Sequence, residues 1–155
     1  SLRAGRSRYA TPRCSQGGHH SLKAGIKMNK NTNIGYNTTL VPIAFTARAD
    51  AGVLGSWQNT TGKDLLVLTR GIHVGTTSTG AATVDAGIAA TAVTNDTLID
   101  GQALNGLAAN TVVQTAGTNG AMLRVVPAGY YVTAFGSADT TGLVATMYIL
   151  VSEIS

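Results

Sequence analysis

Apolar and polar residues alternate with a period of two from about residue 40 onward. In the stretch ATVDAGIAA (82–90), with Asp85 opposite, one face carries only apolar side chains: Val84, Ala86, Ile88 and Ala90. In DLLVLTRGIHV (64–74) the same spacing groups four residues on one face, which Arg70 interrupts: Leu66, Leu68, Ile72 and Val74. Alternation of this kind is typical of half-buried β-strands.

Clusters of Gly, Asn, Asp and Pro separate these alternating segments at short intervals. They are NTTGKD (59–64), STGA (78–81), TNDT (94–97), GTNG (117–120), PAG (127–129) and DTTG (139–142). Such clusters are typical of turns, and no window has the spacing of an amphipathic helix. We therefore predict an all-β domain over residues 41–155, an antiparallel sandwich or barrel of about eight strands.

The last predicted strand, LVATMYILVSEI (143–154), is apolar on both faces. One face carries Leu143, Met147, Ile149 and Val151, and the other carries Val144, Tyr148, Leu150 and Ile154. A strand with two apolar faces is either central in a two-layer structure or lies at a contact between subunits. Both can hold at once, and we expect Tyr148 and Leu150 to contribute to an oligomer interface.

The first forty residues differ in kind from the rest. Seven basic residues and no acidic one fall in residues 1–30: Arg3, Arg6, Arg8, Arg13, Lys23, Lys27 and Lys30. The whole chain carries +4, so residues 31–155 carry 4 − 7 = −3. The basic pI of about 9.5 therefore belongs to this segment, and it is weak support for a nucleic-acid-binding domain.

We expect residues 1–40 to form an extended basic arm. The segment has too few apolar residues to build a core of its own, and ordering a backbone costs about 1–2 kcal/mol per residue. A partner surface would therefore have to order it, with Arg and Lys bound to carboxylates. DNA is a weaker alternative partner, because only Tyr9 and Tyr36 place aromatic rings among the charges for base stacking.

No set of residues predicts catalysis, a metal or a cofactor. The three histidines are His19, His20 and His73, and the only cysteine is Cys14. No zinc-ligand spacing or activated nucleophile can be assembled from them. Asp96 and Asp100 lack the oxygen spacing of a calcium loop, so we expect Asn95 and Asp96 to cap a bend.

The aromatic residues and the low charge favour a structural protein. We expect Trp57 and the pair Tyr130 and Tyr131 to be core and interface residues rather than a ligand-stacking platform. Charged residues make up only 12% of the chain, against roughly 25% in a typical soluble domain, so much of the surface is predicted to face other protein. No apolar run approaches the about 20 residues that span a bilayer.

Residues from about 52 to 151 resemble a known family. The stretches GSWQNTTGKDLLVLTRGIHVGTTSTGAATVDAGIAATAVTNDTLIDGQALNG and VPAGYYVTAFGSADTTGLVATMYILV carry the resemblance. They are similar to small β-sandwich proteins encoded among the head genes of tailed bacteriophages, the head decoration (cement) and head-fibre proteins. The resemblance implies a jelly-roll-like sandwich, commonly a homotrimer, that is bound to the major capsid protein on the surface of the virion.

Three functions follow as hypotheses. The first is a decoration protein whose basic arm clamps onto the capsid shell and stabilises the head. The second is an internal minor capsid protein whose arm contacts DNA. The third is a fibre or spike domain on the virion that binds a host-surface receptor. We expect no enzyme activity, cofactor or membrane association in any of them.

Overall fold

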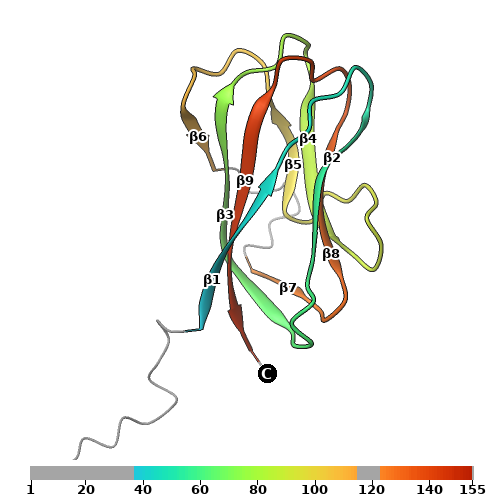
Figure 1. Cartoon of the computed structure of the whole chain (residues 1–155), viewed down its shortest axis with the longest axis vertical. Coiled ribbons are helices and arrows are strands. Elements are labelled where there is room, and N and C mark those ends of the chain that lie inside the picture. Colours follow the sequence, from blue (N-terminus) through green and yellow to red (C-terminus); the bar gives the residue numbers. More distant parts are fainter. Residues whose placement is uncertain (1–36, 115–122, 155) are drawn as a thin grey trace, which may run out of the picture. The chain divides into compact units, whose positions relative to one another are not determined.

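A computed structural model of the chain describes residues 37–114 and 123–154. These residues contain no helix, and their strands number nine (Figure 1). The strands are β1 (Thr38–Ala44), β2 (Gly52–Gln58), β3 (Leu65–Thr76), β4 (Thr83–Ala89), β5 (Ile99–Ala103), β6 (Thr111–Val113), β7 (Arg124–Val126), β8 (Tyr131–Gly136) and β9 (Val144–Glu153).

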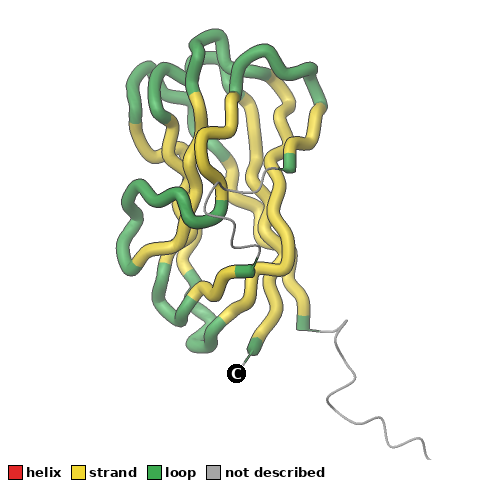
Figure 2. Tube along the Cα trace, turned by 180° about the vertical axis from the view of Figure 1, so that it is seen from behind, coloured by secondary structure: helices red, strands yellow, loops and turns green. Residues whose placement is uncertain are grey.

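The strands form two antiparallel sheets packed as a sandwich. One sheet has the order β1-β9-β3-β6, with β7 also pairing with β3, and the other has the order β2-β8-β4-β5. Figure 2, seen from behind, shows the two layers and the loops that join them at both ends. The chain passes back and forth between the sheets as in a jelly roll. The predicted all-β sandwich is confirmed.

The nine strands fill eight places in the two sheets, because β6 and β7 share one place beside β3. β6 pairs with residues 72–74 of β3, and β7 pairs with residues 65–67 of the same strand. The two short strands therefore lie along one long strand, end to end. This agrees with the prediction of about eight strands. The predicted turn at 117–120 lies outside the described residues.

The core is built from the inward faces of both sheets. In β4, Val84 and Ala86 are fully buried and Ile88 packs against the core, as the alternation predicted. Ala90 follows the end of β4 and is exposed. The largest fully buried side chains come from both layers: Ile72, Leu98, Ile99, Leu104, Met147, Ile149, Val67, Val74, Val84, Val126, Val132 and Val151.

The predicted face of β3 is wrong for half of its members. The pairing of β3 with β9 shifts register between Val67 and Thr69. A bulge adds one residue to a strand, so the side chains after it point to the opposite face from the one that simple alternation predicts. Before the bulge the buried residues are Leu65 and Val67, and after it they are Ile72 and Val74. Leu66 is therefore only half-buried and Leu68 is exposed.

The position of β9 explains one of its two apolar faces. β9 lies between β1 and β3, so it is central in its sheet. The face with Leu143, Met147, Ile149 and Val151 is buried in the core. The opposite face remains accessible, and no partner chain is needed to explain the buried one.

β1 begins earlier than the predicted start of the sandwich at residue 41. Residues 38–40 lie in β1, and they pair with residues 150–152 of β9. The seven basic residues of the predicted arm, together with Cys14, His19 and His20, lie outside the described residues.

A buried asparagine ties the loop between β2 and β3 to the turn between β7 and β8. Asn59 is fully buried. Its Nδ2 donates to the carbonyl oxygens of Lys63 at 2.8 Å, Val126 at 2.9 Å and Pro127 at 3.1 Å. Its Oδ1 accepts from the backbone N–H and the hydroxyl of Thr61. The Asn59 side chain therefore provides hydrogen-bond partners for polar groups of both connections at this end of the sandwich.

Candidate functional site

The outer face of the five-stranded sheet is the most conspicuous accessible surface. The antiparallel register sets Leu40 of β1 opposite Leu150 of β9, and Pro42 opposite Tyr148. Val112 of β6 is 62% exposed, Leu40 is 58% exposed and Tyr148 is 36% exposed. We call these residues, together with Val144, the apolar face: Leu40, Pro42, Val112, Val144, Tyr148 and Leu150.

A groove of about 380 Å³ crosses the apolar face. Leu40, Tyr148 and Leu150 line it from β1 and β9, and Val112 lines it from β6. Gly71 of β3 lies between them and is buried. Because a glycine has no side chain to fill the space, the neighbouring strands stand higher than β3 at this point.

Arg70 is the one residue with a formal charge among those that line the groove. No Asp, Glu or Lys lines it, whereas Arg70 and His73 do. The Arg70 Nε is buried without a hydrogen-bond partner, and burial lowers the pKa of the Arg70 guanidinium from its usual value. The two ion pairs of the described residues, Arg48–Asp50 and Lys63–Glu153, do not include Arg70. The register pairs Arg70 with Ile149, whose side chain is in the core, so a partner seated here would meet mainly apolar side chains.

The outer face of the four-stranded sheet is different. Register places Ser56, Thr133 and Gly87 side by side across β2, β8 and β4, and the Ser56 and Thr133 hydroxyls lie 3.0 Å apart. Asn95, from the loop after β4, packs against Gly87. The middle of this face is therefore polar and partly covered by the chain itself, whereas the exposed Val53 pairs with Phe135 elsewhere on it. The groove lined mainly by apolar side chains lies on the outer face of the five-stranded sheet.

The residues singled out in the sequence do not gather at one site. Tyr148 and Leu150 lie on the apolar face, and the strand alternation was the signal that found them. Val144 lies on β9 with them. The remaining members come from β1 and β6, whose pairing with β9 and β3 the sequence alone does not reveal. His73 lines the same groove, on the face opposite to the buried Ile72 and Val74.

The remaining candidates are structural or lie away from the apolar face. The backbone N–H of Thr97 donates to Asn95 Oδ1 at 3.0 Å, which confirms the predicted bend cap for Asn95. Trp57 is half-buried and packs against the core. Tyr130 is partly exposed beside the turn at 127–129.

Residues 37–114 and 123–154 bring no group of three or more His, Cys, Asp or Glu together in a position to hold a metal ion. In the same part of the chain, no helix is long and apolar enough to cross a membrane. Comparison of the chain with protein-family models, with curated proteins and with solved structures finds no match in any of the three.

Proposed function

We propose that this chain is a virion structural protein: a decoration (cement) protein of a bacteriophage capsid. In this proposal the basic residues 1–30 attach it to the major capsid protein, and the sandwich associates with further copies as a homotrimer on the capsid surface. The observation that carries the proposal is the apolar face, an open sheet surface whose groove no acidic residue or lysine lines.

The apolar face supports a role in assembly. Contiguous apolar surface on a soluble protein marks a place where another protein binds. The face lies over β1, β9 and β3, which the core holds rigidly from the other side, because Met147 and Ile149 of β9 are fully buried. A rigid, preformed surface loses little conformational entropy when a partner covers it. This is the property that a repeated contact in an assembled particle requires.

The charge division along the chain supports separate roles for its two parts. Residues 1–30 carry +7 and residues 31–155 carry −3. A basic segment favours binding to carboxylate-rich protein surfaces through charge-assisted hydrogen bonds. The slightly acidic sandwich has no such preference. We infer that the arm is the anchor and that the sandwich is the part that is anchored.

The proposal is tested on phage heads that lack this protein. The full chain and a chain without residues 1–30 are added to the same undecorated heads, and bound protein is measured by co-sedimentation. We expect the full chain to bind and to raise the temperature at which heads break, because each bound copy stabilises the assembled state. We expect the shortened chain to keep its β-type circular dichroism and to lose binding.

Two outcomes would count against the proposal. Equal binding of both chains would show that residues 1–30 are not the anchor. Retention of the full chain on DNA-cellulose, lost steeply as salt rises, together with no binding to heads, would favour the internal DNA-contacting protein instead.

A further inference from the structure

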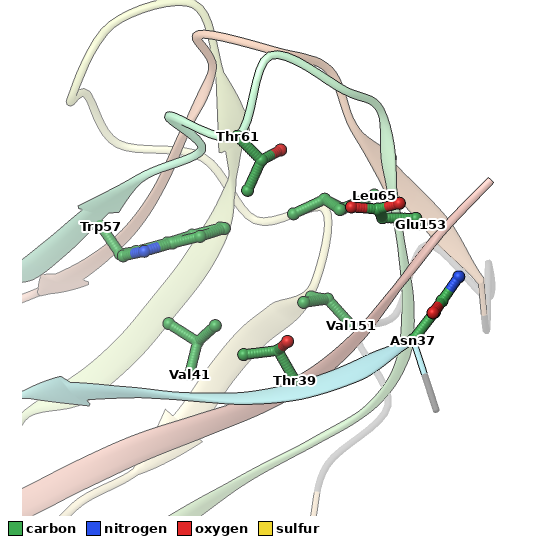
Figure 3. A pocket seen from close by; sticks show the side chains of 8 residues that line it. All are labelled: Asn37, Thr39, Val41, Trp57, Thr61, Leu65, Val151 and Glu153. Carbon is green, nitrogen blue, oxygen red and sulfur yellow. The ribbon is translucent and has the colours of Figure 1, made fainter. Parts of the chain in front are cut away.

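A second cavity lies at the end of the sandwich where β1 and β2 diverge. Its volume is about 240 Å³. Its lining residues come from β1, β2, β3 and β9, from the residue just before β1 and from the loop after β2. In Figure 3 they surround a single space, with the indole ring of Trp57 on one side and Thr39 and Val151 on the other. The cavity is smaller than the roughly 300–1,000 Å³ of sites for drug-sized ligands. It suits a ligand of about one ring.

The lining of this cavity is divided between apolar and polar groups. Val41, Leu65 and Val151 are buried core residues and form the apolar part. Trp57 packs against the same core and presents its ring to the cavity. This mixture differs from the groove on the apolar face, and it suits a ligand that has an apolar side and several hydrogen-bonding groups.

The polar groups around the cavity retain hydrogen-bonding capacity. Within the described part of the chain, no side-chain hydrogen bond joins Asn37 or Thr39 to another residue. The Thr61 hydroxyl donates to Asn59 Oδ1 at 2.7 Å and accepts from the Lys63 backbone N–H at 3.3 Å, so it can offer a ligand only one further lone pair as acceptor. A ligand with hydroxyl groups, which donate and accept, fits this set better than one with acceptors alone.

The cavity has no unneutralised charge. Glu153 is the one ionisable residue that lines it. Its Oε2 lies 2.8 Å from the Lys63 Nζ at the rim. A charged ligand would gain no opposite charge here and would lose water on entry. The site therefore favours a neutral ligand.

We propose that this cavity binds one ring of a neutral sugar. The C–H groups on one side of the ring contact the face of the Trp57 indole, whose electron-rich surface favours them. The hydroxyls on the other side hydrogen-bond to Asn37, Thr39 and Glu153. This inference does not rest on the proposed capsid attachment, and it assigns to the sandwich a recognition function of its own.

Trp57 is the only tryptophan in the chain, so its fluorescence reports directly on the cavity. The full chain is titrated separately with glucose, galactose, mannose and N-acetylglucosamine, and calorimetry repeats each titration that changes the emission. We expect a saturable change with at least one of them and a Kd on the order of 1 mM, because a single ring buries little surface. Glucuronate and glucosamine, which are charged, should bind more weakly than their neutral counterparts.

Two conservative variants locate the binding. Thr39→Val keeps the shape of the side chain and removes the hydroxyl, and Asn37→Ala removes the amide at the start of β1. Each should weaken the best sugar about threefold to tenfold, without changing the circular dichroism spectrum or the melting temperature. Thr69→Val is the matched control, because Thr69 lines the groove on the apolar face. It should leave the Kd unchanged.

Either of two results would overturn the inference. One is the absence of a saturable change with all four neutral sugars. The other is binding of equal strength in the unmodified chain, Thr39→Val and Asn37→Ala. Neither result would affect co-sedimentation of the full chain with heads, so the capsid proposal is judged separately.

Discussion

Leu40 of β1 lies directly opposite Leu150 of β9 on the outer face of the five-stranded sheet. The Leu40 side chain is 58% exposed although its strand neighbours Val41 and Ile43 are in the core. A cross-strand leucine pair on the solvent side stabilises the isolated sheet only modestly, by roughly 0.2–1 kcal/mol. Its larger effect is expected when a second protein covers it and removes the remaining apolar surface from water.

The first prediction concerns self-association through the apolar face. Leu150→Asp should weaken association of the sandwich by about 3 kcal/mol, roughly a hundredfold, because the new carboxylate would lose water without an opposite charge. Tyr148→Asp should act in the same direction. Sedimentation velocity over a concentration series measures the change.

Val93→Asp is the control, because Val93 is an exposed apolar residue in the loop after β4. It should leave association unchanged. An unmodified protein that stays monomeric at high concentration would contradict both the predicted interface and the homotrimer.

The second prediction concerns Asn59. Asn59→Ala should lower the free energy of unfolding by about 3 kcal/mol, because three carbonyl oxygens, that of buried Val126 among them, lose their donor and the Thr61 groups lose an acceptor. Urea denaturation followed by circular dichroism measures it. Gln58→Ala, which removes one exposed bond to the Gly129 carbonyl, should cost less than about 1 kcal/mol. An equal loss of free energy of unfolding in both variants would show that the hydrogen bonds of Asn59 do not stabilise this end of the sandwich more than an exposed bond does.

The third prediction concerns the close approach of the loop after β4 to its strand. A Cβ at Gly87 would overlap Oδ1 of Asn95 and lie 2.7 Å from the Asn95 carbonyl carbon. Gly87→Ala should therefore destabilise the domain by about 1–3 kcal/mol. At Gly71 the nearest atoms to such a Cβ lie at 3.4 Å, so Gly71→Ala should be nearly neutral. Thermal melting of both variants gives the comparison, and a Gly87→Ala protein as stable as the unmodified one would refute the close packing.

The fourth prediction concerns pH. Hydrogen bonds from the Thr141 side chain and from the Thr141 backbone N–H, at 2.7 Å, lower the pKa of Asp139 below its ordinary value. Because the pKa of Asp139 is lower in the folded protein than in the unfolded one, these hydrogen bonds contribute fully to stability above the unfolded pKa of about 4. Their contribution to stability is lost as pH falls through the folded pKa.

Asp139→Asn removes this titration and keeps the shape of the side chain. Melting temperatures measured between neutral and acidic pH should fall less steeply for Asp139→Asn than for the unmodified protein. Parallel curves would show that Asp139 does not contribute to the acid sensitivity.

The fifth prediction concerns the arm. Replacing Arg3, Arg6, Arg8 and Arg13 together by Gln should weaken binding to undecorated heads and flatten its dependence on salt, because ion pairs near solvent are screened at high ionic strength. Co-sedimentation at several salt concentrations measures both effects. An unchanged salt dependence would mean that these four residues do not make the contact.

The sequence by itself determined the fold class and most of the buried faces of β4 and β9. Alternation in β4 and β9 predicted which residues are buried, because side chains in a strand point to opposite faces and only one face meets the other sheet. It also singled out Tyr148 and Leu150, since a second apolar face on one strand is visible without any partner strand. The separation of basic residues 1–30 from the slightly acidic remainder is likewise a property of the sequence.

Only the tertiary structure decided what depends on how distant strands pair. The bulge at Val67 and Thr69 reverses the facing of β3, because it arises from pairing with β9, which lies about eighty residues further along the chain. The cavity beside Trp57 arises in the same way. Its walls come from strands at opposite ends of the chain, and the local pattern around Trp57 is that of an ordinary core residue. A periodic pattern specifies which side of a strand is apolar, whereas a groove or a cavity exists only once separate strands are placed beside one another.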